Sequence, residues 1–569
     1  MLRLLSVALL CCSGVHATGY DYVVVGGGVA GSVVAARLAE KHSVLLLNIA
    51  GAPPSKYNGP VMVSDELIVQ TNMTATPGMA ARIHQPGYAP VPKFSTGETG
   101  SSPARWLGGS SVVALSLFLY DKAMDWAPGW DWNLMQNYML KSKIQPTHDP
   151  VYLHPLTKAF IEAVPGAMAT PSSQRPDGTK ITAQAAYLEE APKKLTIMEG
   201  VRADKLIIKG GVCTGVAVRD LKSGGYKTIT AGKEVIVAAG YLYTPRLLFL
   251  SGLGDAKELA ASGIPVVKDL PAVGKNLAAP RFTPVSWRTS EPTLSQMMGP
   301  PISRGPAVKE AFQSVVAEAT VQLSKDAIAQ FMPLYYAPKS APLQYSLQGE
   351  PWPLSTNAYT VLVTMRTEAK GSIKIDKDPD VSPIIVHEPL TPEDQKRGAA
   401  AVEAAVGMGS ALPSQGRVEH AQDWSAVYDG RGTCRMGTDL STSVVDTSLK
   451  VHGVRNLRIV DGSAIPSSTP FLALPEVMML AERAADLIGE VQTYAVADIP
   501  DGASLWEVVQ SAEVPPSDMA ARAVPSSEEG VPASMAMVLG AAVALSSAAV
   551  ARCLSRRMAG EMSDRYVMA

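Results

Sequence analysis

The chain has 569 residues, of which 47% are apolar and 18% are charged, and its formal net charge at pH 7 is −2. This length predicts two or three domains with an ample hydrophobic core. The near-neutral charge argues against nucleic acid, or an anionic membrane surface, as a partner.

The first 17 residues have the pattern of a secretory signal peptide. Arg3 precedes an apolar run, and Val15-His16-Ala17 places small residues where a signal peptidase cleaves. The alternative is a buried first strand, but the next strand is expected to begin only three residues later. We therefore expect entry into the secretory pathway. Removal of this segment leaves Cys213 and Cys434 in the body of the chain, and their spacing does not show whether they pair.

The run from Asp21 to Gly31 predicts a strand, a tight turn and a helix. Gly26, Gly28 and Gly31 form the pattern G-x-G-x-x-G, in which the glycines allow a sharp turn, close approach of backbone amides to a pyrophosphate, and close packing of the helix on its strand. A second apolar run, Val44 to Leu47, follows the helix, and it ends next to Asn48, near the point where a ribose-binding residue is expected. The sequence therefore predicts a βαβ nucleotide-binding unit; a glycine-rich turn without a ligand is the alternative.

Later segments predict the remaining layers. Trp106 to Ser111 contains two glycines followed by hydroxyls, a pattern that suits a backbone lying against a phosphate or a flavin ring. Residues 194–220 predict a β-meander, and a helix is expected from Tyr243, with proline near its start and glycine past its end. Strands around 355–387 and a helix around 391–408 are expected in a different layer.

Four separated stretches together resemble the glucose-methanol-choline (GMC) flavoprotein oxidoreductases, in order and in spacing, from about residue 20 to residue 490. They are Gly26 to Gly31; Leu107 to Ser111; Ala239-Gly240 through Gly254 with Val273 to Leu277; and Gly432 to Gly437 continuing through Asn456 to Ser463 and on to Asp486. The resemblance implies a mixed fold, α/β and α+β overall, with a Rossmann-like FAD-binding domain and a substrate domain on an antiparallel sheet.

Resemblance and composition together predict the domain boundaries. The expected segments are a signal peptide, 1–17; an FAD-binding domain, 20–56, 103–140, 194–285 and 437–490; a substrate-side domain with its loops, 57–102, 141–193 and 286–436; a linker, 491–530; a transmembrane helix, 531–551; and a tail, 552–569.

The resemblance also implies a cofactor and a reaction. It implies noncovalent FAD, because the stretch before Leu107 offers no histidine for a flavin link. In such enzymes the flavin N5 takes a hydride from an alcohol carbon while a histidine removes the hydroxyl proton. The implied cofactor-binding positions are Gly26, Gly28, Gly31, Asn48, Trp106, Gly108, Gly109, Ser110, Ala114, Asp461 and Gly462.

Four positions depart from the family pattern. Asn48 replaces a glutamate that binds the ribose, and Ala114 replaces an asparagine. The two catalytic positions, a histidine and its His or Asn partner, are Asp429 and Leu472 here. An ionised Asp429 would disfavour reduced flavin, and with an ordinary pKa of about 3.9 it is a poor base unless burial raises that pKa. Arg431 would compensate if it pointed the same way, and Asp429 is alternatively a turn residue before glycine.

The C-terminal region predicts a membrane anchor. A Pro-, Ser- and acid-rich stretch leads to Val531–Ala551, which has no charged residue and is followed by Arg552, Arg556 and Arg557. With the signal peptide, this predicts a type I membrane protein whose flavin domain is lumenal or extracellular. Because Ala, Gly and Ser dominate this segment, a removable anchor signal or an amphipathic tail are the alternatives.

The sequence thus predicts an FAD-dependent oxidoreductase acting on a small-molecule alcohol, and no metal pattern is visible. Two alternatives follow from the loss of both catalytic side chains. One is a non-oxidative flavoprotein, similar to the hydroxynitrile lyases or light-driven fatty acid decarboxylases of the family, and the other is a catalytically silent flavin-binding protein tethered to a membrane.

Overall fold

The computed structural model describes most of the residues between 19 and 489. The described residues are 19–52, 82–83, 106–113, 118–122, 124–145, 153–171, 173, 181–293, 319–333, 358–375, 383–418, 424–426, 430–467, 469–470 and 473–489. All of them lie in the compact unit Met1–Ala497. The predicted signal peptide, linker, transmembrane helix and tail fall outside these residues.

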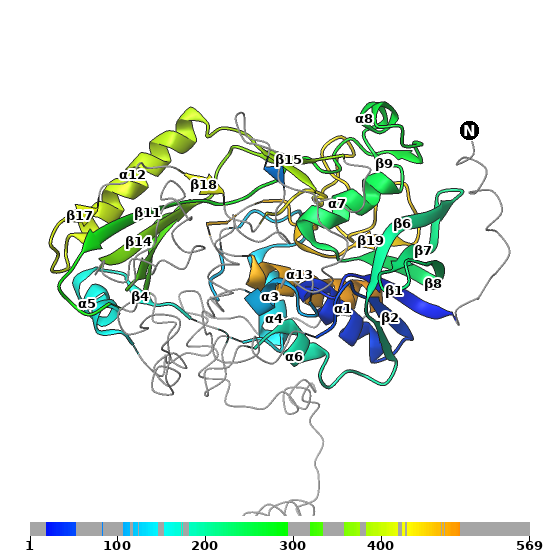
Figure 1. Ribbon diagram of the computed structural model, residues 1–569, viewed down its shortest axis with the longest axis horizontal. Coiled ribbons are helices and arrows are strands. Elements are labelled where there is room, and N and C mark those ends of the chain that lie inside the picture. Colours follow the sequence, from blue (N-terminus) through cyan, green and yellow to red (C-terminus); the bar gives the residue numbers. More distant parts are fainter. Residues whose placement is uncertain are drawn as a thin grey trace, which may run out of the picture. The chain divides into compact units, whose positions relative to one another are not determined.

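A sheet with a parallel core contains the predicted βαβ unit and forms one half of the fold (Figure 1). The neighbouring strands β5, β2, β1 and β8 run parallel, and β19 adds to β8 in the same direction. Their bounds are β1 Tyr20–Val25, β2 Val44–Leu47, β5 Leu195–Met198, β8 Tyr226–Val237 and β19 Leu457–Ile459. The residues of β2 and those of β19 are all buried, as expected of strands covered on both faces.

Helices pack beside this sheet. The helix α1 (Val29–Ala39) packs against α13 (Leu474–Gly489) and against α6 (Ala183–Tyr187), and α13 also packs against α4 (Trp132–Lys141). All but one residue of α1 are buried, because alanine, valine and glycine dominate it and allow neighbours to approach closely.

The strand β8 takes part in two kinds of pairing. Its second half pairs in parallel with β1, where Val235 faces Val23. Its first half pairs antiparallel with β7 (Val212–Asp220), which in turn pairs antiparallel with β6 (Val201–Lys209). The predicted β-meander is therefore present from β6 onward and continues into β8, but the first strand of the predicted range, β5, pairs in parallel with β2 instead. Cys213 in β7 and Cys434 are both buried free thiols, so the two cysteines do not form a disulfide.

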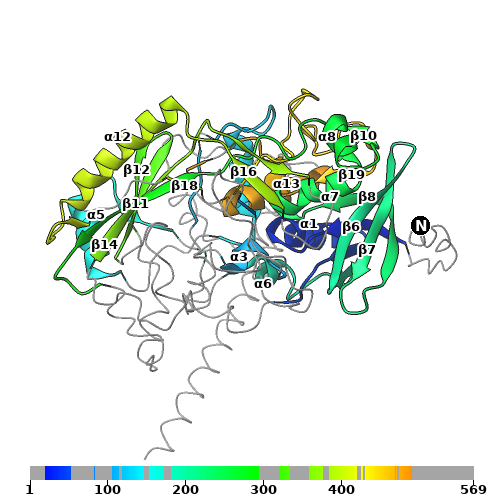
Figure 2. The same cartoon turned by 45° about the horizontal axis from the view of Figure 1, so that its top comes forward.

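A second, antiparallel sheet lies apart from the sheet with the parallel core (Figure 1). Its order is β17-β11-β14-β13-β12-β4, with β18 also on β11. The strands are β4 Met168–Ala169, β11 Arg281–Arg288, β12 Ala319–Ser324, β13 Ala327–Met332, β14 Ala358–Met365, β17 Arg417–Val418 and β18 Ser425–Ala426. The helices α12 (Pro392–Gly409) and α5 (Pro155–Ala163) cover one face of it (Figures 1 and 2).

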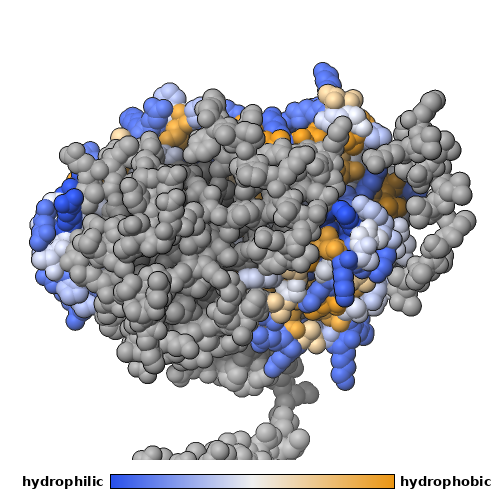
Figure 3. Space-filling view, in the orientation of Figure 1, coloured by the Kyte–Doolittle hydropathy of each residue, from blue (hydrophilic) through white to orange (hydrophobic). Residues whose placement is uncertain are grey.

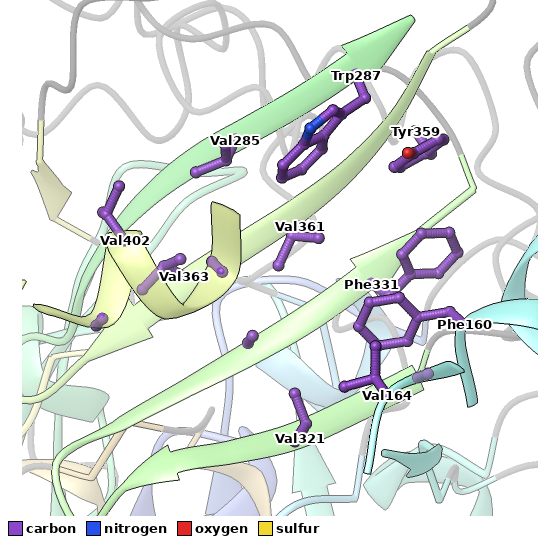
Figure 4. Close-up of a cluster of buried hydrophobic side chains, with 14 of the residues drawn as sticks. Phe160, Val164, Val285, Trp287, Val321, Phe331, Tyr359, Val361, Val363 and Val402 are labelled. Carbon is purple, nitrogen blue, oxygen red and sulfur yellow. The ribbon is translucent and has the colours of Figure 1, made fainter. Parts of the chain in front are cut away.

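The core of this sheet is aromatic and β-branched. Phe331 stacks on Phe160 of α5 and lies beside Tyr359, which stacks on Trp287 (Figure 4). All four side chains are at most 2% exposed. The antiparallel sheet expected for the substrate side is thus packed around its own hydrophobic cluster.

The elements around residues 355–409 follow the sequence pattern closely. Besides β14, the strands β15 (Gly371–Lys374) and β16 (Ile384–His387) form a small sheet with β3 (Arg82–Ile83). The helix α12 begins with a capping box, in which Thr391 Oγ1 accepts from the Asp394 amide and the Asp394 carboxylate accepts from the Thr391 amide.

One helix begins earlier than the sequence suggests. The helix α7 spans Gly240–Leu250, so Pro245 is an interior residue rather than one near the start. Three short elements complete the description: α3 (Ser110–Val113), the 3₁₀ helix η4 (Gly462–Ala464), and the two-stranded sheet of β9 (Leu253–Gly254) and β10 (Lys268–Asp269), which flanks α8 (Ala256–Ala261).

Among the described residues, none of the helices combines the length and the apolar run needed to cross a bilayer. On the described surface in Figure 3, hydrophobic residues form separate patches among hydrophilic ones. The large apolar side chains that are most exposed there are Met168, Tyr226, Val266, Val267 and Leu440.

Candidate functional site

The carboxyl ends of the parallel strands gather the predicted cofactor-binding segments at one edge of the sheet. The Gly26 amide, after β1, donates to Leu47 O at 2.9 Å, and the Ala238 amide, after β8, donates to Val25 O at 2.8 Å. The Val460 amide, after β19, donates to Val237 O at 2.8 Å. In open parallel sheets this edge is where ligands bind.

The three glycines of the first motif differ in what surrounds them. A Cβ on Gly26, whose φ is +105°, would lie 2.5 Å from Ala238 O, and a Cβ on Gly31 would lie 1.8 Å from Gly26 O. These two glycines therefore allow the turn and the close packing of α1 on β1. A Cβ on Gly28, in contrast, would meet nothing within 4 Å. Gly28 is the N-cap of α1 and has no side-chain cap, so the amides at this helix end face open space.

A second pair of glycines lies against the first motif. The Gly108 amide donates to Gly27 O at 2.8 Å, and a Cβ on Gly109 would lie 2.7 Å from Gly28 Cα. The φ angles of Gly108 and Gly109 are +88° and +52°. Two backbone segments separated by 80 residues of sequence thus touch at the N-terminus of α1. This bare backbone cradle fits a pyrophosphate, which needs amide donors and space free of side chains.

Of the side chains around the second glycine pair, some hold the turn in place and one is open to a ligand. Ser111 Oγ donates to Gly108 O at 2.6 Å and accepts from the Ala183 amide at 2.9 Å, which ties this turn to α6. Trp106 is buried and packs on Val112 and Ala50. Ser110, in contrast, is exposed. Ser110 is therefore the hydroxyl of this segment that is open to a ligand, while Trp106 supports the turn from behind.

Asn48 supports the first glycine loop. It is 8% exposed, its Oδ1 accepts from the Gly27 amide at 3.0 Å, and its Nδ2 donates to Ala50 O at 2.6 Å. The amide side chain therefore has two opposite partners within the protein, an N–H and a carbonyl. A carboxylate could accept from Gly27 but could not donate to Ala50.

Asp461 organises the far end of the same edge. Its carboxylate accepts from the Gly240 amide at 2.9 Å, from Thr244 Oγ1 at 2.6 Å and from the Ser463 amide at 2.7 Å. Burial raises the pKa of Asp461, while these hydrogen bonds act in the opposite direction. Gly462 follows directly, and its carbonyl accepts from the Gly432 amide at 3.2 Å. Asp461 thereby joins the first turn of α7 to η4.

Pro245 explains a contact that the sequence did not reveal. Because proline has no N–H, the carbonyl of Tyr241, four residues earlier, loses its usual helical donor. The hydroxyl of Thr433 donates to Tyr241 O at 2.7 Å instead. Thr433 belongs to the Gly432 to Gly437 stretch, so this bond fixes that stretch to α7. Pro245 inside a helix indicates that the carbonyl of Tyr241 needs another donor. The sequence gives this indication only if α7 is known to begin at Gly240.

Three predicted site residues, Ala114, Asp429 and Leu472, lie outside the described residues. The segments beside the last two do meet. Arg431 is 0% exposed, and its Nη1 donates to Thr469 Oγ1 at 2.7 Å. The backbone of Arg431 also pairs with Ala278, next to the first residues of β11. A buried guanidinium therefore joins the two chain segments that lead to the substituted catalytic positions.

No group of three or more His, Cys, Asp or Glu side chains suited to a metal ion occurs in the described part of the chain. The one carboxylate described above at this edge, Asp461, already accepts from three protein donors, and the other polar groups there are backbone amides, the Asn48 amide and hydroxyls, which suit a nucleotide rather than a cation. The residues present therefore fit a dinucleotide such as FAD.

Comparison with known proteins agrees with this site. Two models of the GMC oxidoreductase family match, one over residues 160–280 and one over residues 367–481. An oxygen-dependent choline dehydrogenase of Staphylococcus saprophyticus is 28% identical over 556 residues, covering 82% of this chain and 94% of the relative.

Two solved structures share the fold. A pyridoxine 4-oxidase from Mesorbium loti superposes with a TM-score of 0.62 at 21% identity, covering 83% of this chain and 100% of the other. A formate oxidase variant from Aspergillus oryzae RIB40 superposes with a TM-score of 0.69 at 19% identity, covering 84% and 99%. The matches and the carboxyl-edge site together show that the chain belongs to the GMC oxidoreductase family, whose members bind FAD.

Proposed function

We propose that this protein oxidises the CH–OH group of a small-molecule alcohol with a noncovalently bound FAD. The observation that carries the proposal is the contact of the Gly109 and Gly28 backbones at the N-terminus of α1, which leaves a cradle free of side chains for a pyrophosphate. When bound, FAD would supply the acceptor for the hydride that leaves the alcohol carbon.

The chain's own residues would hold the cofactor and set the charge around it. The amides at the start of α1 and the Ser110 hydroxyl would bind the phosphates, and Asn48 would shape the loop on the ribose side. In the proposed active site Asp429 stands where the family has a catalytic histidine. A histidine there could become cationic, whereas Asp429 cannot. Arg431, two residues away and fully buried, is a permanent cation that could offset the negative charge of Asp429.

An absorption spectrum of the purified protein, followed by an anaerobic panel of alcohols, tests this function. We expect the spectrum of a bound oxidised flavin and its bleaching by at least one alcohol. Acid precipitation should release the flavin into the supernatant, because no covalent link is expected. A bound flavin that no alcohol bleaches would contradict alcohol oxidation. Hydrocarbon release from a fatty acid under blue light would then support the decarboxylase-like alternative.

We further propose that residues 1–17 direct secretion and that residues 531–551 anchor the protein, with the flavin domain lumenal or extracellular. The support is the sequence pattern alone: an apolar N-terminal run, and an uncharged C-terminal run followed by arginines. Protease digestion of intact membrane vesicles that contain the full chain tests it. We expect the flavin domain to be protected until detergent opens the vesicles. Recovery of the protein in the soluble fraction would contradict an anchor.

A further inference from the structure

The strand β2 is not followed by the carboxylate that a dinucleotide-binding unit usually carries there. In such units an Asp or Glu near the end of the second strand accepts hydrogen bonds from the ribose hydroxyls. Here this position is Asn48, whose Oδ1 accepts from the Gly27 amide and whose Nδ2 donates to Ala50 O. The βαβ unit therefore offers the ribose no anionic acceptor of its own after β2.

The neighbouring strand β5 supplies a carboxylate at the same edge of the sheet. It pairs in parallel with β2, with Met198 opposite Leu47, and the next residue is Glu199. The Asn48 amide donates to Met198 O at 2.9 Å, and the Val201 amide donates to Asn48 O at 3.2 Å. These two bonds hold the turn that carries Glu199 against Asn48. Glu199 thus follows β5 at the edge where Asn48 follows β2.

The Glu199 side chain lies against the turn after β2. A Cβ on Gly51 would lie 2.6 Å from Glu199 Oε2 and 3.4 Å from its Oε1, so both oxygens approach this glycine. The carbonyl of Gly51 accepts from the Leu107 amide at 3.0 Å, and the next amide, that of Gly108, donates to Gly27 O. The carboxylate is therefore one backbone contact away from the glycine turns of the proposed phosphate cradle.

Gly51 provides room for this carboxylate. Its φ is not positive, so its backbone conformation does not require glycine, whereas a side chain would collide with Glu199 Oε2. Glu199 is exposed, and among the described residues its carboxylate has no hydrogen-bond donor and no ion-pair partner. The Asp461 carboxylate, in contrast, accepts from three protein donors. Glu199 therefore presents two acceptor oxygens to a ligand at this edge.

We propose, on the basis of the proposed FAD cofactor, that Glu199 accepts hydrogen bonds from the ribose hydroxyls of the adenosine part, in place of a carboxylate after β2. A vicinal diol has two O–H donors, and a carboxylate has two acceptor oxygens that form charge-assisted bonds. Asn48 then supports the first glycine loop, while the neighbouring strand recognises the ribose. The ligand class is a nucleotide with unmodified 2′ and 3′ hydroxyls.

Calorimetric titration of the full-length apoprotein with ADP and with 2′,3′-dideoxy-ADP tests the proposal. The two nucleotides differ only in the ribose hydroxyls. We expect the Kd for ADP to be at least about tenfold lower, because hydrogen bonds to a charged acceptor are among the stronger ones. Glu199→Ala should raise the Kd for ADP and leave that for the dideoxy compound unchanged, so that the ratio falls below about threefold.

Glu190→Ala is the matched control. Glu190 is also an exposed glutamate, but it precedes β5 instead of following it, so this variant should keep the ratio of the two Kd values. A ratio that survives Glu199→Ala would overturn the role of Glu199. Equal Kd values for the two nucleotides in the unmodified protein would overturn it too, as would a protein that binds FAD but not ADP.

Gly51→Ala tests the position of the carboxylate. The added Cβ displaces Glu199 Oε2, so this variant should also lower the ratio of the two Kd values. In a Glu199→Ala background the same change should have no further effect, because the displaced group is absent. Equal effects of Gly51→Ala in the two backgrounds would show that the carboxylate over Gly51 does not bind the ribose.

Flavin bleaching separates this proposal from the proposed reaction. If an alcohol bleaches the bound flavin but the ratio of the two Kd values does not depend on Glu199, the ribose site is wrong and alcohol oxidation stands. If the ratio depends on Glu199 but no alcohol bleaches the flavin, alcohol oxidation is wrong and the ribose site stands. If the protein binds neither FAD nor ADP, both proposals are wrong.

Discussion

Arg37 in α1 and Glu482 in α13 form a two-pronged ion pair across 445 residues of sequence. Arg37 Nε lies 2.8 Å from Glu482 Oε2, and Arg37 Nη2 lies 2.9 Å from Glu482 Oε1. The Glu482 side chain is 0% exposed and also accepts from the Tyr187 hydroxyl at 2.6 Å. Burial and the Glu482 carboxylate raise the pKa of Tyr187. The pair therefore fastens α1, the helix of the proposed phosphate site, to α13, the last helix of the described residues.

Glu482→Gln should destabilise the protein strongly. The substitution removes the countercharge of a largely buried arginine, and breaking a buried pair in this way lowers the free energy of unfolding by about 3 kcal/mol. Urea unfolding at pH 7 measures this loss. The control Glu162→Gln disrupts an exposed pair with Lys158, in which both side chains are 68% exposed, and should change stability by less than about 0.5 kcal/mol. Similar effects of the two changes would contradict a stabilising role for the Arg37–Glu482 pair.

The bond between Thr433 and Tyr241 O should depend on Pro245. Thr433→Val leaves that carbonyl without its donor, and we expect a loss of about 1 kcal/mol. In a Pro245→Ala background the new Ala N–H can bond to the same carbonyl, so the loss caused by Thr433→Val should fall towards zero. A double-mutant cycle of unfolding free energies gives this coupling. Additive effects would show that the proline does not determine the role of Thr433.

Gly28 and Gly31 should separate cofactor binding from folding. Gly28→Ala adds a Cβ that meets no protein atom within 4 Å, so the apoprotein should keep its stability within about 0.5 kcal/mol while its Kd for FAD rises at least about tenfold. Gly31→Ala places a Cβ against Gly26 O and should destabilise the apoprotein by about 3 kcal/mol. Urea unfolding and titration with FAD measure the two effects. Unchanged FAD affinity in Gly28→Ala would mean that this open space is not the phosphate site.

His154 should make stability sensitive to acid. It is 1% exposed, its Nδ1 caps α5 by accepting from the Leu156 amide at 3.2 Å, and burial lowers its pKa to about 4 from an ordinary 6.5. The unfolded chain therefore takes up this proton first as the pH falls. The contribution of neutral His154 is complete above pH 6.5 and is lost between pH 6.5 and about 4, up to about 3 kcal/mol.

His154→Asn isolates this effect, because asparagine can also cap a helix but does not titrate. The loss of unfolding free energy between pH 7 and pH 4.5 should be smaller in this variant than in the unmodified protein. Equal losses in the two proteins would assign the acid sensitivity to other groups.

Asp429→His should raise the midpoint potential of the bound flavin. The substitution replaces a carboxylate, which disfavours the negative charge of reduced flavin, with a group that can become cationic. Redox titration followed by absorbance measures the potential. Glu162→His, which makes the same change of charge on the exposed surface of α5, should leave it unchanged. An unchanged or lower potential in Asp429→His would show that residue 429 is remote from the flavin.

The sequence could predict those parts of the site that depend on neighbours in the chain. The strand, turn and helix around Gly26 follow from local patterning, as do α12, with its capping box, and the meander that ends in β8. The contact of Gly109 with Gly28 could not be derived, because two glycine backbones carry no side-chain signal for each other. The Arg37–Glu482 pair likewise cannot be predicted from local sequence, since the pattern around each residue is also typical of a charged residue on the surface of a helix.

The role of Asn48 shows a different limit. The family resemblance marks this position as one that binds the ribose, and Asn48 stands there in place of a glutamate. In the structure both ends of the amide bond within the protein, to Gly27 and to Ala50. Whether the Asn48 side chain bonds to a ribose or to the protein backbone depends on the geometry of the turn, which residue identity alone does not give.

The place of β19 beside β8 has a consequence for the order of folding during synthesis. The strand that completes the parallel core, and the helix that carries Glu482, come from the last 33 residues of the segment ending at Gly489. Until those residues leave the ribosome, one side of β8 and the packing surface of α1 have no cover. Such non-local pairing is slow, and exposed strand edges invite aggregation. A nascent chain stalled before residue 457 should therefore depend on chaperones, whereas one extended past Gly489 can close its nucleotide-binding domain.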